Sequence, residues 1–149
     1  MILPDFKVFP RKGRILGVDW GLRRIGVAVS DVTHEFVFVR PVISIARNAT
    51  NHADTVAKVA TEEGVAGIVV GLPVRNNGTE SETTKMVRDF ANALSAKVEL
   101  PICFVEENLT SMVAQESMGR VRVRDIKQSL DSESARVILE NAISIIKRA

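Results

Sequence analysis

Four acidic residues, far apart in the chain, have the chemistry to hold divalent cations. They lie at three places, each beside an apolar or helical pattern: Asp19, the pair Glu106 and Glu107, and Asp131. Carboxylate oxygens suit Mg²⁺ or Mn²⁺, and converging carboxylates repel one another unless a cation is present. Two such ions about 3.5–4 Å apart can activate water and stabilise the leaving oxygen in phosphodiester cleavage.

Each acidic residue also has an ordinary structural explanation. Asp19 could cap a turn, although a carboxylate beside so apolar a run needs a partner. Glu106 and Glu107 could form a solvated turn, and Asp131 could be the N-cap of the last helix. Successive strand side chains point to opposite faces, so only one of the two glutamates can readily join Asp19 unless a bulge turns both inward. The hypothesis is therefore a shared metal site with Asp19 as its first ligand.

Two groups of basic residues could contact the phosphates of a substrate. Arg23 and Arg24 lie in the turn that follows Asp19. A second group lies near the C-terminus and consists of Arg120, Arg122, Arg124 and Lys127. A solvated basic surface explains the second group at least as well, and solvated turn residues are slightly favoured for Arg23 and Arg24. The net charge of the chain is only +2, so bulk charge does not indicate a nucleic-acid binder. His34 and His52 have no metal-binding spacing, and we expect both at the surface.

The composition is that of one globular, cytosolic domain. The chain has 149 residues, of which 46% are hydrophobic and 26% charged. Cys103 is its only cysteine, which excludes an intramolecular disulfide, and its apolar surroundings predict a buried thiol. No apolar stretch approaches the roughly 20 residues of a membrane span. Residues 1–14 contain two prolines and several basic residues, which predicts an irregular basic arm that can be disordered.

The elements that would position the acidic residues are predicted to form a mixed α/β fold. Apolar runs predict strands at 15–19, 24–30, 37–45, 65–72 and 101–105, the first two joined as a hairpin. Pro41 places the third strand at a sheet edge or bulge. The apolar fourth strand is typical of a central parallel strand. Three antiparallel strands followed by βα units predict a five-stranded mixed sheet with helices on both faces, in one domain over residues 15–149.

Helices are expected where the apolar period changes. A helix over residues 52–63 ends at Gly64, and a second begins at Thr79–Glu82, whose spacing is that of a capping box. A short helix is expected at 110–118 and a basic loop at 119–130. The last helix then begins at Asp131 and carries a strong apolar stripe.

Four motifs, in order, closely resemble those of the YqgF family, also called the RuvX or Holliday-junction-resolvase family. They are Leu16-Gly-Val-Asp-Trp-Gly-Leu-Arg-Arg-Ile-Gly-Val-Ala-Val-Ser-Asp31, then Ile68-Val-Val-Gly-Leu-Pro73 with Gly78-Thr-Glu80, then Glu106-Glu-Asn-Leu-Thr-Ser111, and finally Lys127 with Asp131 and Ser134-Ala135. The resemblance runs from about residue 15 to 147. It implies a ribonuclease-H-like fold and a divalent-metal nuclease that trims the 5′ end of pre-16S rRNA. It also implies that Asp19, Glu107 and Asp131 occupy the acidic active-site positions, with Glu106 at the adjacent one.

The third motif departs from the family pattern. Glu106 stands where the family usually has Asp, and Asn108 stands where it usually has Arg. The main hypothesis remains Mg²⁺- or Mn²⁺-dependent hydrolysis of pre-rRNA, free or in ribosomal precursor particles, by a monomer or weak homodimer. Cleavage of branched DNA by a dimer is the nearest alternative. The two departures keep a second alternative open, an inactive nucleic-acid-binding or assembly factor. An actin-like ATPase would need two such domains.

Overall fold

The computed structural model describes residues 1–74, 79–108 and 123–149, with side chains for all of these except Asn108 and residues 123–132. Five strands and three helices are described. In chain order they are β1 (Ile15–Asp19), β2 (Arg24–Ser30), β3 (Val37–Ser44), α1 (His52–Glu63), β4 (Gly67–Val74), α2 (Glu82–Lys97), β5 (Ile102–Asn108) and α4 (Val123–Arg148).

The strands form one mixed sheet in the order β3-β2-β1-β4-β5. β1 and β2 pair antiparallel as the predicted hairpin, and β2 pairs antiparallel with β3. β4 pairs in parallel with both β1 and β5, which confirms it as a central parallel strand. β3 is an edge strand, and its register against β2 shifts between Ile25 and Val27, so both expectations drawn from Pro41 are confirmed.

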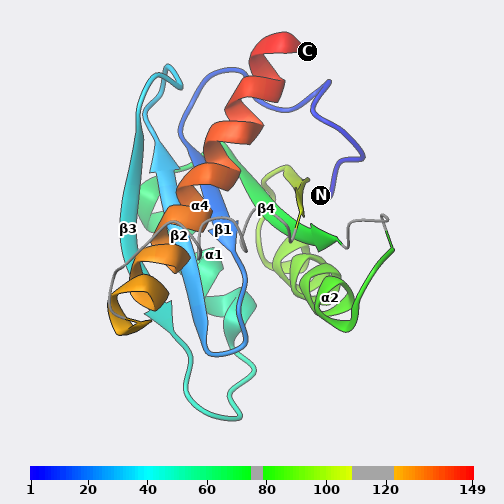
Figure 1. Ribbon diagram of the computed structural model, residues 1–149. Helices are drawn as coiled ribbons and strands as arrows, with labels where there is room; N and C mark the ends of the chain where they lie inside the picture. Colours follow the sequence, from blue (N-terminus) through cyan, green and yellow to red (C-terminus); the bar gives the residue numbers. More distant parts are fainter. Residues whose placement is uncertain (75–78, 109–122) are drawn as a thin grey trace.

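Helices cover both faces of the sheet, as predicted. Figure 1 shows α4 lying across one face, with α1 and α2 behind the sheet. Alternation along β1 explains why two separate cores form. Leu16 and Val18 pack into the core shared with α1 and α2, whereas Ile15 packs into the core under α4. Each central strand is therefore apolar on both sides.

Helix α4 packs close to the backbone of the sheet at Gly17. A methyl group at Gly17 would lie 2.8 Å from Cβ of Leu139 and 3.0 Å from the carbonyl oxygen of Ala135. Only glycine permits this approach without displacing the helix. Since Gly17 lies two residues before Asp19, the packing fixes α4 relative to that carboxylate.

The N-terminal arm lies against the sheet, in contrast to the disorder that its composition allowed. Leu3, Phe6 and Phe9 are buried in the core under α4. Ile2 forms a parallel bridge with Ile102, and the Leu3 amide donates to the Ile102 carbonyl at 2.7 Å. The burial of its apolar residues therefore outweighs the tendency of its charged residues and prolines toward disorder.

Two helix starts differ from their predictions. The N-cap of α2 is Ser81, which forms a capping box with Thr84, so the expected Thr79–Glu82 pair does not fill that role. Helix α4 begins at Val123, so residues 123–130 are helical rather than loop, and Asp131 is not an N-cap. The short helix expected at 110–118 and residues 119–122 lie outside the described residues.

Three further predictions concern two single side chains and the membrane. His34, expected at the surface, is buried, and its Nε2 lies 2.7 Å from the Gly13 carbonyl oxygen. Cys103 is buried as predicted, and burial raises the pKa of its thiol to about 11. None of the helices in the described parts of the chain has the length and apolarity that crossing a bilayer requires.

Candidate acidic site

Asp19 ends β1 on the face of the sheet that α4 covers. It follows Val18, which pairs with Val70 of β4, so continuation of that register places Asp19 level with Gly71. Ile15, Gly17 and Asp19 share the α4 face because alternate strand residues point the same way. The carboxylate is half-buried at the end of an otherwise buried strand, as the sequence predicted.

Glu106 and Glu107 lie on opposite faces of the sheet. Parallel pairing of β5 with β4 continues without a shift through both residues, so no bulge turns them to one side. Cys103 and Val105 pack under α4, and Glu107 continues this row toward the end of the strand. Glu106 lies on the α2 face and lines a cavity there. The expectation that Glu106 assists Glu107 at the metal site is therefore corrected, because the strand's alternation separates them.

The Glu107 carboxylate reaches over β4 toward β1. Its Oε2 would lie 3.2 Å from a methyl group at Gly71, and Gly71 is level with Asp19. The same methyl group would lie 2.3 Å from Cδ1 of Ile138 on α4. The glycine thus leaves the space through which Glu107 extends below the helix. The two predicted acidic residues are brought to one face and one end of the sheet.

The surroundings of Glu107 disfavour its negative charge. Burial raises the pKa of this carboxyl above its ordinary value of 4.5. A nearby cation would reverse this effect by favouring the ionised form. The donor set therefore fits a hard divalent cation, which prefers carboxylate oxygens.

The course of α4 brings the backbone of Asp131 toward this end of the sheet. Ala135 lies over Gly17, and α4 runs antiparallel to β1 (Figure 1). From Ala135 back to Asp131 the helix advances about 6 Å. From Gly17 forward to Asp19 the strand advances about 7 Å. The steps from Ala135 to Asp131 and from Gly17 to Asp19 have the same direction and similar length, so the backbone of Asp131 lies toward the same end of the sheet as Asp19.

The side chain of Asp131 lies outside the described residues. Among the side chains that are described, no three histidine, cysteine, aspartate or glutamate residues converge as a metal-binding group. The structure thus places Asp19 and Glu107 on one face and at one end of the sheet, and gives for Asp131 only its place in the helix.

Arg23 lies in the tight turn beyond Asp19 and Arg24 is the first residue of β2, and both are exposed. Gly21 makes the turn, since a methyl group there would lie 2.3 Å from the Arg24 carbonyl oxygen. Arg23 is further held through its carbonyl, which accepts from the Ile45 amide at 2.8 Å.

The second basic group is only partly described. Arg124 and Lys127 belong to α4, but their side chains lie outside the described residues, as do Arg120 and Arg122 entirely. Their predicted phosphate contacts remain a prediction.

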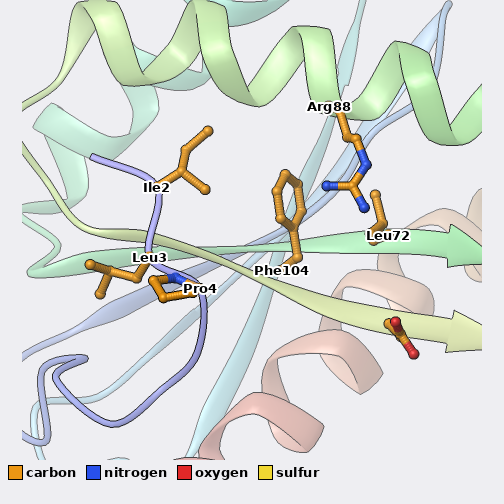
Figure 2. Close-up of a pocket in the computed structure, with 7 residues that line it drawn as sticks. Ile2, Leu3, Pro4, Leu72, Arg88 and Phe104 are labelled. Atoms are coloured by element: carbon orange, nitrogen blue, oxygen red, sulfur yellow. The ribbon is translucent and has the colours of Figure 1, made fainter.

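Sequence reasoning missed a cavity of about 390 Å³ on the α2 face beside Glu106. Figure 2 shows its walls, which come from the arm, β4, β5 and α2. They are formed by Ile2, Leu3, Pro4, Leu72, Arg88, Phe104 and Glu106. The Arg88 guanidinium carbon lies 5.5 Å from the centroid of the Phe104 ring. The signal available in the sequence was Phe104 two residues before Glu106, which puts both on one face of a strand.

Comparisons with known proteins found a matching family model and similar sequences. A family model described as "RuvX: Holliday junction resolvase" matches residues 13–145. A protein of Orientia tsutsugamushi (strain Ikeda), named "Putative pre-16S rRNA nuclease", is 34% identical over 135 residues, covering 89% of this chain and 84% of its own. A protein of the same name from Maridesulfovibrio salexigens is 34% identical over 129 residues, covering 85% and 95%.

A solved structure shares the fold at low sequence identity. It is the Thermus thermophilus RuvC in complex with a Holliday junction substrate, with a TM-score of 0.50, 13% identity and coverage of 90% of both chains. The likeness shows a ribonuclease-H-like fold.

Proposed function

The chain belongs to the RuvX family and is a nuclease of ribonuclease-H-like fold, and we propose that it cleaves precursor 16S rRNA with divalent cations held by Asp19, Glu107 and Asp131. The observation that carries this proposal is the placement of Glu107. Its carboxylate lies on the same face and at the same end of the sheet as Asp19, in surroundings that disfavour its charge.

The residues of the chain have separate roles in this reaction. Asp19 from β1 and Glu107 from β5, with β4 between them, would hold the cations, and Asp131 would complete the set from α4. Bound Mg²⁺ or Mn²⁺ supplies Lewis-acid activation of water and neutralises charge on the phosphate. Gly71 keeps space for Glu107, and Gly17 lets α4 lie close above the site.

The substrate is recognised through its backbone charge. Arg23 and Arg24 project from the turn after Asp19, and guanidinium groups bind phosphate oxygens well. Arg120, Arg122, Arg124 and Lys127 would contact more distant phosphates. The names of the relatives favour pre-16S rRNA as the substrate. We propose that the enzyme acts in the cytoplasm, on this RNA free or in a ribosomal precursor particle.

The test compares the parent with Asp19→Asn on pre-16S rRNA in the presence of Mg²⁺. We expect cleavage to fall by at least about 100-fold, because loss of a metal ligand removes several kcal/mol of transition-state stabilisation. The matched control is Asp89→Asn, an exposed aspartate of α2, which should cleave like the parent. Equal cleavage by Asp19→Asn and the parent would refute the mechanism.

A second readout does not depend on cleavage. Mn²⁺ should raise the thermal midpoint of the parent, because a ligand that binds only the folded state stabilises it. It should raise that of Asp19→Asn much less. If the parent binds RNA, cleaves none and gains no stability from either metal, the chain is instead an inactive binding or assembly factor.

The description of the matched family favours branched DNA as a second candidate substrate. Cutting a junction symmetrically requires two active sites, so this activity predicts a homodimer, whereas processing of one RNA strand does not. Sizing of the protein, together with assays on a four-way DNA junction and on pre-rRNA, distinguishes the two substrates.

A further inference from the structure

The cavity on the α2 face lies on the other side of β5 from the acidic site. Glu106 lines the cavity, and Glu107, the next residue, points to the α4 face. β5 is the last strand in the sheet order, and the arm bridges it at Ile102, four residues before Glu106, so a flexible chain can pass around the strand's edge beside Glu106 and Glu107. The cavity is thus placed to bind one part of a substrate strand while a phosphate of the same strand reaches the acidic site.

Phe104 and Arg88 form a stacking surface in this cavity. The guanidinium group lies over the ring, and Figure 2 shows Phe104 between Ile2 on one side and Arg88 on the other. Arg88 is also paired with the Glu80 carboxylate, which holds the guanidinium in place. Aromatic rings and arginine planes are the groups on which unpaired bases stack in single-stranded nucleic acids.

Glu106 gives the cavity a hydrogen-bond acceptor. It follows Phe104 by two residues on the same face, about 7 Å along the strand. An ionised carboxylate accepts hydrogen bonds and donates none, so it selects a ligand edge that carries N–H groups. The Watson–Crick edge of guanine offers two adjacent N–H donors, whereas the other bases offer one donor group. Two charged groups around an aromatic ring favour a base over an apolar peptide side chain.

We propose that this cavity binds an unstacked base of the RNA substrate, with guanine preferred. The base stacks on Phe104 and directs its N–H edge to Glu106, while the backbone turns around β5 toward Glu107. This inference rests on the proposed nuclease function for the identity of the ligand. It gives Glu106 a role in specificity in place of the metal-binding role suggested by the sequence.

The test measures binding without cleavage, in the Asp19→Asn protein. Three eight-residue probes are compared by fluorescence anisotropy: all-uridine RNA, the same RNA with one guanosine, and a wholly abasic ribose-phosphate chain. We expect the abasic chain to bind about tenfold more weakly than the uridine RNA, the loss of one stacked base. Adding Phe104→Leu should weaken RNA binding by a similar factor but leave abasic binding unchanged. Phe36→Leu, at an exposed phenylalanine before β3, is the control.

The glutamate is tested separately because its side chain is exposed and its substitution does not endanger folding. Glu106→Gln should remove most of the preference for the guanosine-containing RNA, whereas Glu99→Gln, at another exposed glutamate, should retain it. Equal binding of all three probes, or a Phe104→Leu protein with unchanged RNA affinity, would overturn the proposal.

The nuclease proposal and the base-cavity proposal are overturned by different results. If the parent and Asp19→Asn cleave alike, the nuclease mechanism fails, yet base-dependent binding can still be measured. If cleavage depends on Asp19 while binding ignores the base, only the cavity proposal fails.

Discussion

Asp31 and Glu107 lie at opposite ends of the sheet and have opposite electrostatic environments. Asp31 follows β2 and accepts hydrogen bonds from the Glu35 amide at 2.8 Å, the Phe36 amide at 2.9 Å and the Thr33 hydroxyl. These donors, led by Phe36, lower the pKa of Asp31 to about 2. Burial instead raises the pKa of Glu107. The first carboxylate stabilises a turn, whereas burial disfavours the charge of the second, as is common for carboxylates at functional sites.

The largest expected effect comes from Glu107→Gln. Cleavage should fall by at least about 100-fold, because an amide is a poor ligand for a hard cation and carries no charge. Stability should change in the other direction. Glu107 has a raised pKa when folded, so the unfolded chain releases its proton first and stability falls as pH rises above about 4.5.

Glu107→Gln removes this fall, so the variant should be more stable than the parent at pH 7 in EDTA and lose that advantage near pH 4. Chemical denaturation at both pH values measures the difference. A variant that is less stable than the parent at pH 7 would show that Glu107 is a structural carboxylate, like Asp31.

Gly71→Ala should have an intermediate effect on both properties. Its new methyl group would lie 2.3 Å from Ile138 Cδ1 and 3.2 Å from Glu107 Oε2, so the helix side chain or the glutamate must move. Overpacking of this kind costs about 1–3 kcal/mol of unfolding free energy. Cleavage should fall as well, because Glu107 loses its space. Gly64→Ala is a contrasting variant with open space around the new methyl group, although it carries backbone strain at a φ of 63°. Unchanged activity in Gly71→Ala would argue against the reach of Glu107 across β4.

The smallest effect is expected from Asp31→Ala. The lowered pKa means that Asp31 stabilises the folded state at pH values above 3.8, and that this contribution disappears as pH falls toward about 2. The denaturation midpoint of the variant should therefore lie slightly below that of the parent at pH 6 and converge with it near pH 2. Cleavage of RNA should remain at the parental level. A large loss of cleavage would end the distinction between the structural and the functional carboxylate.

The sequence alone determined the main elements and the presence of an acidic site. Alternating or continuous apolar residues specify β1, β2 and β4, because the two-residue period of a strand appears directly in its sequence. The hairpin after Asp19 follows from the short polar turn between two such runs. Four motifs in order added the family, and with it the expectation of a ribonuclease-H-like nuclease. These features depend on residues that are close together in the chain.

Only the tertiary structure showed which glutamate shares a face of the sheet with Asp19. Alternation says that Glu106 and Glu107 point to opposite faces, but the register with β4 and the position of α4 decide which face each takes. The start of α4 at Val123 and the packing of the arm at Phe6 and Phe9 also depend on distant partners. Local patterns carry no information about those partners, because packing energy between elements, rather than local propensity, fixes where they meet.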